Sequence, residues 1–422
     1  MPDLSNKDIS KNLILNSVHE FSWGFGMAFH TTYAIVPLFL KQLGAPSAVV
    51  LSVAGLFAIL FAIPQLVSAA YARNMRNIKA GVIGVHGLLF PPLFMMSFVF
   101  AFLAPTGSFA WVYYYICFII YGLAIGFVLP IWAGFIHRTT NRGTRGSFIG
   151  ISFVFNSVGG FIGGFLVKIL FSSSIPFPNN FGIGFFIYFF SVIIATIAFI
   201  GFKVRPVKTA KKKKSLLQFI NEIKAIINKH KNFRRYLLGR IFFTANFPAI
   251  SLYAVFMQDK FGFDVSEAGV FTVINVTAYG IASYISGRIG DRFGHKAALI
   301  ISFSAHLLAV VTVLLATSMF WVYLVFMFLG MGLGAFVPAS MNLVYEFAKE
   351  RDNKLYMAMI DTFLAPFTLV VIITAGMLSG FIPLEWLFIG IGFSLLAGLL
   401  FMMFMVKDPG NSARDEFILR SN

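Results

Sequence analysis

The chain has 422 residues and a formal net charge of +17, but only 12% of its residues are charged, about half the ~25% that is usual in soluble domains. Hydrophobic residues make up 58% of the chain, and phenylalanine alone supplies 53 residues. So little polar surface cannot cover a water-soluble globule, which excludes a soluble enzyme, a disordered chain and a nucleic-acid module as the main body. With one cysteine, Cys117, a disulfide framework and a cysteine-based metal cluster are excluded as well.

Long apolar stretches predict an all-α membrane protein with twelve transmembrane helices, because each crossing needs about 20 apolar residues. Several stretches contain proline, which membrane helices tolerate when neighbouring groups re-satisfy the freed backbone. The expected spans are 12–42, 47–72, 80–104, 109–137, 147–173, 181–204, 236–260, 266–287, 297–317, 319–348, 356–380 and 383–407.

The basic residues predict the orientation of these spans. Of the 33 lysines and arginines, all except Lys41, Lys168 and Lys260 fall in the tails, in the loops after even-numbered spans, or at the helix ends beside them. Positive charge is enriched on the cytoplasmic side of membrane proteins. We therefore expect a multi-pass protein of the cell (plasma or inner) membrane, with both termini in the cytoplasm.

The longest loop divides the chain into three parts. It contains Lys211–Lys214, followed by apolar residues at helical spacing, which is typical of a basic amphipathic helix on an anionic inner leaflet. A nucleic-acid site is disfavoured here because the loop lacks interleaved exposed aromatic residues and lies beside a bilayer. The expected domains are a six-helix bundle over 1–204, a cytoplasmic linker over 205–235, and a second six-helix bundle with a short tail over 236–422.

The two halves also resemble each other in sequence. Trp111-Val112-Tyr113 recurs as Trp321-Val322-Tyr323, and Tyr33-Ala34-Ile35 is echoed by Tyr253-Ala254-Val255. Gly122, Gly126 and Pro130 recur in the same order as Gly330, Gly334 and Pro338. Repeats with an even number of helices keep the same orientation and are related by an axis along the membrane normal. The sequence therefore predicts two pseudo-symmetric six-helix bundles.

A motif expected between the eighth and ninth spans carries a family resemblance. It reads Gly287-Arg288-Ile289-Gly290-Asp291-Arg292-Phe293-Gly294-His295-Lys296, and it resembles the short cytoplasmic loop of the major facilitator superfamily. Gly290 and Gly294 allow a tight turn and close approach, and Asp291 can face the positive end of a neighbouring helix. The resemblance implies a latch that closes the cytoplasmic side, formed by Gly287, Gly290, Asp291, Arg292, Gly294 and Lys296.

Other family patterns are weaker. The equivalent first-half loop, Arg73–Lys79, has Asn74 where the family has aspartate, and its glycines are missing. On the fifth span Gly150, Gly159 and Gly163 fit part of an antiporter pattern, which slightly favours efflux. The simpler interpretation is close helix packing, because Gly159/Gly163 and Gly160/Gly164 are pairs of small residues one helical turn apart.

Ionisable residues at membrane depth are costly and are therefore candidates for function. The clearest are Glu20 and Asp361, with Arg240 at similar depth as the cation that could compete for a vacated carboxylate. A carboxyl group that binds and releases a proton would couple transport to a proton gradient. The alternatives are a structural ion pair for Glu20 and, for Asp361, a partner for the Arg73/Arg76 loop.

The family resemblance implies that the first, fourth, seventh and tenth helices line the cavity. A metal site is not expected, because adjacent His19 and Glu20 point about 100° apart on a helix. We assign no role to His86 and His306, and packing between helices is the alternative for each cavity candidate. The expected substrate-cavity residues are His19, Trp23, His30, Tyr33, Tyr114, Tyr121, Thr244, Ser251, Gln258, Asn342 and Tyr345.

The residues and the resemblance together predict a secondary transporter, a symporter or an antiporter, and not an enzyme. It would move a small, neutral or amphipathic organic solute by alternating access, with proton coupling, and with efflux preferred over the alternative of an uptake permease. The rivals of another class are a non-transporting membrane sensor and an intramembrane enzyme. We expect a monomer that contacts membrane lipids, including anionic inner-leaflet lipids, with no cofactor, metal or nucleic acid. The chain also lacks a phosphate-binding loop for ATP.

Overall fold

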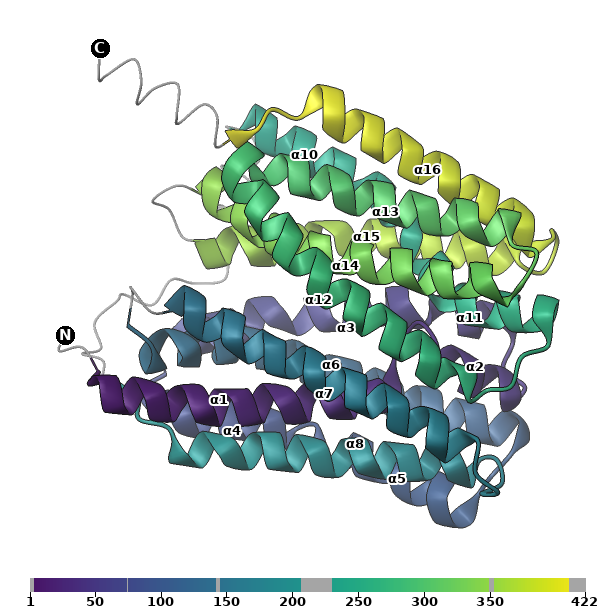
Figure 1. The fold of residues 1–422 in the computed structure, drawn as a ribbon, viewed down its shortest axis with the longest axis horizontal. Helices are drawn as coiled ribbons and strands as arrows, with labels where there is room; N and C mark the ends of the chain where they lie inside the picture. The colour runs from purple at the N-terminus through teal and green to yellow at the C-terminus, as the bar shows by residue number, and fades with distance from the viewer. Residues whose placement is uncertain (1–3, 74, 142–144, 206–229, 349–352, 410–422) are drawn as a thin grey trace. The chain divides into compact units, whose positions relative to one another are not determined.

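The computed structural model describes residues 4–73, 75–141, 145–205, 230–348 and 353–409. Within these residues the regular structure is helical, and eleven helical stretches are long and apolar enough to cross a membrane. They correspond to the second to twelfth predicted spans (Figure 1). The fold class is therefore confirmed. Most of the expected linker helix lies outside the described residues, as do Asn74 and residues 142–144.

The helices of the first half are α1 (Asn6–Met27), α2 (Ile35–Gln42), α3 (Ser47–Arg73), α4 (Ile78–Gly87), α5 (Phe90–Phe98), α6 (Gly107–Thr139), α7 (Arg145–Phe171) and α8 (Asn179–Ala198). Short 3-10 turns at Ala28–His30 (η1) and Phe199–Gly201 (η3) and a π turn at Val99–Leu103 (η2) extend three of them. The second half contains α10 (Lys231–Phe243), α11 (Asn246–Phe261), α12 (Glu267–Phe293), α13 (His295–Leu315), α14 (Met319–Ala348), α15 (Asn353–Leu378) and α16 (Leu384–Met405).

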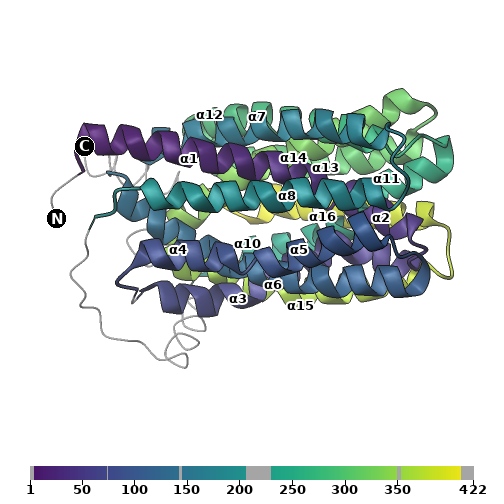
Figure 2. The ribbon, with the colours of Figure 1, turned by 90° about the horizontal axis from the view of Figure 1, so that it is seen from below.

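Contacts between residues group the chain into two units. The first contains Met1–Val53, Phe57–Lys213 and Phe263–Val273, and the remaining residues form the second. In the first unit α8 contacts α1 on one side and α4 and α5 on the other (Figure 2), while α1 also packs against α7. In the second unit α13 packs against α14 and α16, and α10 packs against α16.

The first predicted span is interrupted, which corrects the expectation of one helix. After the 3-10 turn at Ala28–His30 the chain leaves the helix, and α2 begins only at Ile35. The Thr31 hydroxyl accepts a hydrogen bond of 3.0 Å from the Ile35 N–H, so it satisfies the first N–H group of the second segment. Pro37 is the third residue of α2, where its missing N–H has no cost because the first N–H groups of a helix have no partner within it.

Proline marks two further interruptions. The seventh predicted span divides into α10 and α11, and Pro248 is again the third residue of the later segment. The third span divides between α4 and α5, where Pro91 and Pro92 lie in the first turn of α5. By contrast, the prolines of α3, α6, α14 and α15 lie inside continuous helices. At each interruption, proline therefore lies in the first turn of the helix that follows.

The sequence repeat recurs in the packing of each unit. Gly122 and Gly126 on α6 face α3, and a Cβ at Gly126 would lie 2.6 Å from a backbone oxygen of α3. Gly330 and Gly334 on α14 face α12, where a Cβ would overlap with backbone oxygens. In both units, glycines at matching positions allow two backbones to approach closely.

Glycines of α7 allow its backbone to approach that of α1 closely. A Cβ at Gly163 would lie 2.5 Å from the carbonyl oxygen of Phe25, and a Cβ at Gly159 would overlap with the carbonyl of Phe21. Gly150, on the same helix, has open space around it. The prediction of close packing through these small residues is confirmed for Gly159 and Gly163.

Lys168, the lysine predicted inside a span, lies near the end of α7 and has a counter-charge. Its Nζ is 2.6 Å from Oε1 of Glu267, at the start of α12 and within the same unit. The two backbones approach closely there, because a Cβ at Gly164 would lie 3.1 Å from the carbonyl oxygen of Gly269. Lys168 is therefore neutralised by an ion pair.

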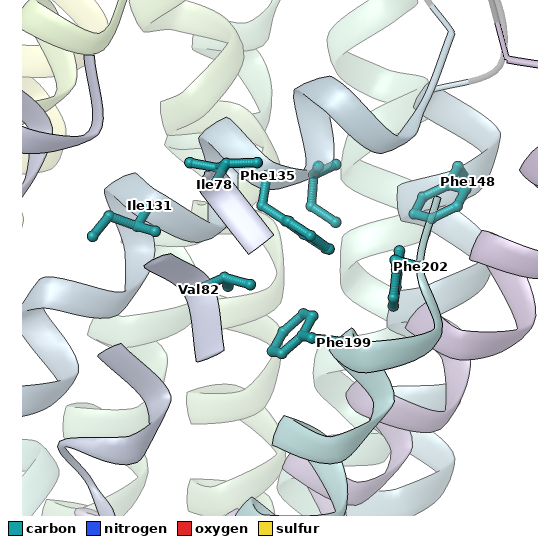
Figure 3. Close-up of a cluster of buried hydrophobic side chains, with 8 residues drawn as sticks. Ile78, Val82, Ile131, Phe135, Phe148, Phe199 and Phe202 are labelled. Carbon is teal, nitrogen blue, oxygen red and sulfur yellow. The ribbon is translucent and has the colours of Figure 1, made fainter. Parts of the chain in front are cut away.

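An aromatic and aliphatic cluster holds one end of the first unit together (Figure 3). The Phe199 ring centroid lies 5.1 Å from that of Phe135, and 4.6 and 4.8 Å from those of His19 and His86. The cluster thus positions two buried imidazoles. Its members are Ile78, Val82, Ile131, Phe135, Ile136, Phe148, Phe199 and Phe202, from α4, α6, α7 and the end of α8.

We predict that Gly163→Leu destabilises the first unit, because the new side chain must push α7 away from the α1 backbone. Overpacking of this kind costs about 1–3 kcal/mol, measurable as a lower unfolding temperature of the purified protein in detergent. Gly150→Leu is the matched control on the same helix and should leave that temperature almost unchanged. Equal effects of the two substitutions would contradict the packing described here.

Candidate functional site

Three predicted cavity residues meet in one buried cluster in the first unit. The Tyr114 hydroxyl lies 2.8 Å from Nε2 of His30, and the hydroxyls of Tyr121 and Tyr188 lie 2.6 Å apart. The Tyr188 hydroxyl also contacts the sulfur of Met27 at 3.0 Å. His30 belongs to the 3-10 turn that interrupts the first span. The interruption therefore places an imidazole among tyrosines of α6 and α8.

A second buried cluster surrounds His19. Its Nδ1 lies 3.1 Å from the carbonyl oxygen of Ala195, and its ring centroid is 5.4 Å from that of His86. His86 Nδ1 lies 2.7 Å from the Val82 carbonyl oxygen, and Trp23 packs edge-on against His86, with ring centroids 5.7 Å apart. With both Nδ1 atoms at carbonyl oxygens, each ring holds its proton on Nδ1 and presents Nε2 as an acceptor.

Glu20 lies between α1 and α7. Asn156 Nδ2 donates a hydrogen bond of 3.0 Å to its Oε2, and His19 Nε2 lies 3.7 Å from its Oε1. Gly24, one turn further along α1, allows this approach, because a Cβ there would overlap with the backbone of Asn156. Among the ion pairs formed by the described residues, none joins Glu20 to lysine or arginine. The structural alternative of an ion pair for Glu20 would therefore involve His19, and only when that imidazole is protonated.

The predicted cavity residues of the first span do not share one set of neighbours. His19 and Trp23 contact His86 on α4, whereas His30 contacts rings of α6 and α8. Tyr33 follows the interruption, and its hydroxyl hydrogen-bonds Thr272 within the first unit. An unbroken helix would place residues at steps of three or four on one face, but the first span is interrupted between His30 and Ile35.

In the second unit Arg240 is the central charged residue. Its side chain is buried in α10, and Nη1 donates a hydrogen bond of 2.9 Å to the Tyr236 hydroxyl. Its guanidinium carbon lies 4.5 Å from the centroid of the Phe336 ring on α14. Thr244 and Ser251, on the same predicted span, are buried and bonded to backbone groups: Thr244 donates to the Ile241 carbonyl, and Ser251 accepts from a backbone N–H of α3.

The remaining predicted residues of this unit lie on α11, α14 and α15. Gln258, Asn342 and Asp361 are half-buried on α11, α14 and α15. The Tyr345 side chain lies outside the described part of the structure. These positions remain predictions.

Sequence reasoning missed five polar residues that the structure buries or pairs. Four of them lie outside the first, fourth, seventh and tenth spans, and Asn246 begins the second segment of the seventh span. Asn246 Nδ2 lies 2.9 Å from Nδ1 of His306, although His306 was assigned no role. The available signal was simply a polar side chain inside an apolar helix. The five are His86, Asn156, Tyr188, Asn246 and His306.

The latch motif is helical for most of its length, which corrects the expected loop. α12 continues to Phe293 and α13 starts at His295, so only Gly294 interrupts the helices. Its φ of 93° is open to glycine and strained for other residues. Lys296 Nζ donates a hydrogen bond of 2.7 Å to the Met403 carbonyl, and His295 lies 3.8 Å from Glu346. Asp291 and Arg292 are exposed.

A family model described as Major Facilitator Superfamily matches residues 21–164 and 236–419 of the chain. The match covers both halves and omits the linker. No curated protein matches the chain closely enough to count as a relative.

Solved structures of transporters are similar to the chain over nearly its whole length. A POT family transporter in complex with a thioalcohol-conjugated peptide has a TM-score of 0.70 and 12% identity, covering 94% of this chain and 95% of that one. The D-xylose–proton symporter has a TM-score of 0.66 and 16% identity, covering 95% of this chain and 99% of that one. The nucleoside transporter NupG has a TM-score of 0.66 and 14% identity, covering 94% of this chain and 99% of that one. Such low identity establishes the shared fold alone.

We predict opposite effects for two alanine substitutions in the motif. Gly294→Ala forces a side chain into a backbone conformation that costs about 1–3 kcal/mol, and its Cβ would overlap with the Asp408 carboxylate. The unfolding temperature should fall. Gly287→Ala, with open space around it inside α12, should raise stability by up to roughly 1 kcal/mol. A tolerated Gly294→Ala would mean that the chain can turn here without glycine.

Proposed function

The chain belongs to the major facilitator superfamily, and from this premise we propose that it moves a small, neutral or amphipathic organic solute across the membrane by alternating access. Membership of this family makes it a multi-pass membrane transporter rather than an enzyme. Proton coupling and export are the finer parts of the proposal. Uptake of a small metabolite is the second candidate, because the glycines that favoured export also serve helix packing.

The interrupted helices support a solute site near the middle of the bundle. Irregular backbone at membrane depth is tolerated where it is buried in protein or lines a cavity, and secondary transporters build their sites at such breaks. Two of the three interruptions follow α1 and α10, the helices that carry Glu20 and Arg240. We propose that each of these segments contributes to the solute pathway within its own unit.

The tyrosine and histidine cluster supports a solute with a large apolar part. His30, Tyr114 and Tyr121 present aromatic rings, and their polar atoms already bond one another. A phosphorylated solute would instead require several basic side chains. We propose that these residues form the wall of the solute pathway in the first unit.

The burial and the contacts of Glu20 are the observation that supports proton coupling. It is buried, and its contacts are the neutral amide of Asn156 and the imidazole of His19. A carboxyl group with such partners can take up and release a proton as solvent reaches it or leaves it. Asp361, half-buried on α15, is the second candidate. That the D-xylose–proton symporter has this fold supports the proposal in general terms.

The motif around Gly294 would close the cytoplasmic side. Lys296 and the last turn of α16 are already joined by a hydrogen bond, so the motif can tie neighbouring helix ends together. Gly294→Ala should then slow transport as well as lower stability, whereas Gly390→Ala, with open space around it on α16 and outside the motif, should leave transport intact.

We predict that Glu20→Gln uncouples transport. Glutamine can still accept the Asn156 hydrogen bond but cannot release a proton, so accumulation driven by a pH gradient should be lost while solute exchange at equilibrium persists. The measurement uses proteoliposomes and a solute that raises the unfolding temperature of the purified protein. Glu385→Gln, at an exposed position on α16, is the matched control.

If Glu20→Gln still concentrates the solute in a pH-dependent way, Asp361→Asn becomes the decisive variant. Retention of pH-driven accumulation by both variants would remove the proposed coupling. The sign of accumulation in oriented vesicles distinguishes export from uptake.

The orientation is tested by labelling single cysteines in a Cys117→Ala background. Cys117 is buried, so its removal lowers background without exposing a new surface. Cysteines at Lys41 and Lys260 should react with an impermeant thiol reagent outside intact cells, because these lysines lie opposite the basic loops. Cysteines at Lys212 and Lys296 should react only after lysis, and the reverse pattern would invert the topology.

A further inference from the structure

The Arg240 guanidinium has fewer partners than its burial demands. The side chain is 9% exposed, and its one hydrogen bond in the described part of the chain joins Nη1 to the Tyr236 hydroxyl at 2.9 Å. The buried Nε has no hydrogen-bond partner. A guanidinium carries five N–H donors, so most of its hydrogen-bonding capacity is unused.

The surroundings attract a cation but do not neutralise it. The guanidinium carbon lies 4.5 Å from the centroid of the Phe336 ring and 5.8 Å from that of Tyr236, distances that give cation–π attraction. Among the described residues Lys168 pairs with Glu267, and His19 and His295 lie beside Glu20 and Glu346. None of these pairs includes Arg240.

An unbalanced buried cation is costly, and at membrane depth it is a sign of function. Lys168, which lies inside another span, shows how the chain neutralises a lysine that serves structure, through Glu267 at 2.6 Å. Among the described residues no carboxylate is shown to pair with Arg240 in this way, although methionine or leucine would fill a similar volume beside Phe336 without that cost. The missing counter-charge is therefore expected from outside the chain.

We infer that Arg240 binds the carboxylate of the transported solute, which makes the substrate class a monocarboxylate with an apolar or aromatic body. Nε–H and a neighbouring terminal N–H form the fork that grips a carboxylate through two parallel hydrogen bonds. One guanidinium balances one negative charge, and the Phe336 ring beside it suits an apolar body. This inference rests on the proposed function and narrows its amphipathic solute.

The test measures thermal unfolding of the purified full chain with acetate, hexanoate and benzoate, each against its neutral amide: acetamide, hexanamide and benzamide. A ligand that binds only the folded protein raises the unfolding temperature. Hexanoate and benzoate should raise it more than acetate, and the amides should have little effect. Inorganic phosphate tests whether any anion suffices.

Three variants locate the effect. Arg240→Met should weaken carboxylate binding by about tenfold or more, the usual loss for a charge-assisted hydrogen bond. It should also raise the unfolding temperature without ligand, since it removes an unbalanced buried charge. Arg240→Lys keeps the charge without the fork, so it should bind carboxylates at intermediate affinity. Arg234→Met, at an exposed position on the same helix, is the matched control and should behave as the wild type.

Four results would overturn the inference: no response to any carboxylate at millimolar concentrations, equal responses to acids and amides, a stronger response to phosphate, or an unchanged carboxylate response in Arg240→Met. Different results would contradict the proposed function. Carboxylate binding without pH-driven accumulation would remove proton coupling and leave the Arg240 site, whereas accumulation of a neutral solute without carboxylate binding would remove the site and leave the transporter.

Discussion

The hydrocarbon interior of a bilayer offers no hydrogen bonds to the peptide backbone, and this constraint explains most of the architecture. Each span must be helical, and a break is possible only where other groups satisfy the freed backbone. The break after η1 meets this condition, because the Thr31 hydroxyl accepts the Ile35 N–H and Pro37 has no N–H to satisfy. At Gly294 a single residue of unusual φ joins two helices directly. Irregular backbone is thus confined to a few points, and those points position the candidate site.

The same solvent gives no hydrophobic force between helices, so contact depends on close packing and polar pairs. Glycines of α6, α7 and α14 let backbones touch, and some buried polar groups of the first unit find partners: His30 with Tyr114, Glu20 with Asn156. Other buried polar atoms of the described residues have no hydrogen-bond partner, and among them Nε of Arg240 is the one that belongs to a permanently charged group. An unpartnered donor on a fixed charge is where a ligand is expected to contribute.

Sequence reasoning reached the fold because its signals are long and cooperative. Twenty-residue apolar stretches, the motif ending at Lys296 and the recurring Gly-x-x-x-Gly…Pro pattern each extend over many residues, and the glycine repeat reappears as matching helix contacts in both units. Glu20, Arg240 and His30 could also be selected, because polar residues are rare in such helices. Their partners could not be selected, because Asn156, Tyr188 and His86 lie on other helices. The local sequence does not indicate which helices are in contact.

By itself, the sequence determined the helical membrane class, the family and the residues whose burial needs an explanation, because composition and periodicity are properties of the chain alone. Only the tertiary structure decided which prolines break a span: Pro37 and Pro248 begin new helices, whereas Pro130 and Pro338 lie within continuous ones. It also decided that Lys168 has a counter-charge and that Nε of Arg240 has no partner. The physical reason is the same in each case: the cost of a buried charge or a freed backbone group depends on what packs against it, and that neighbour comes from a distant part of the chain.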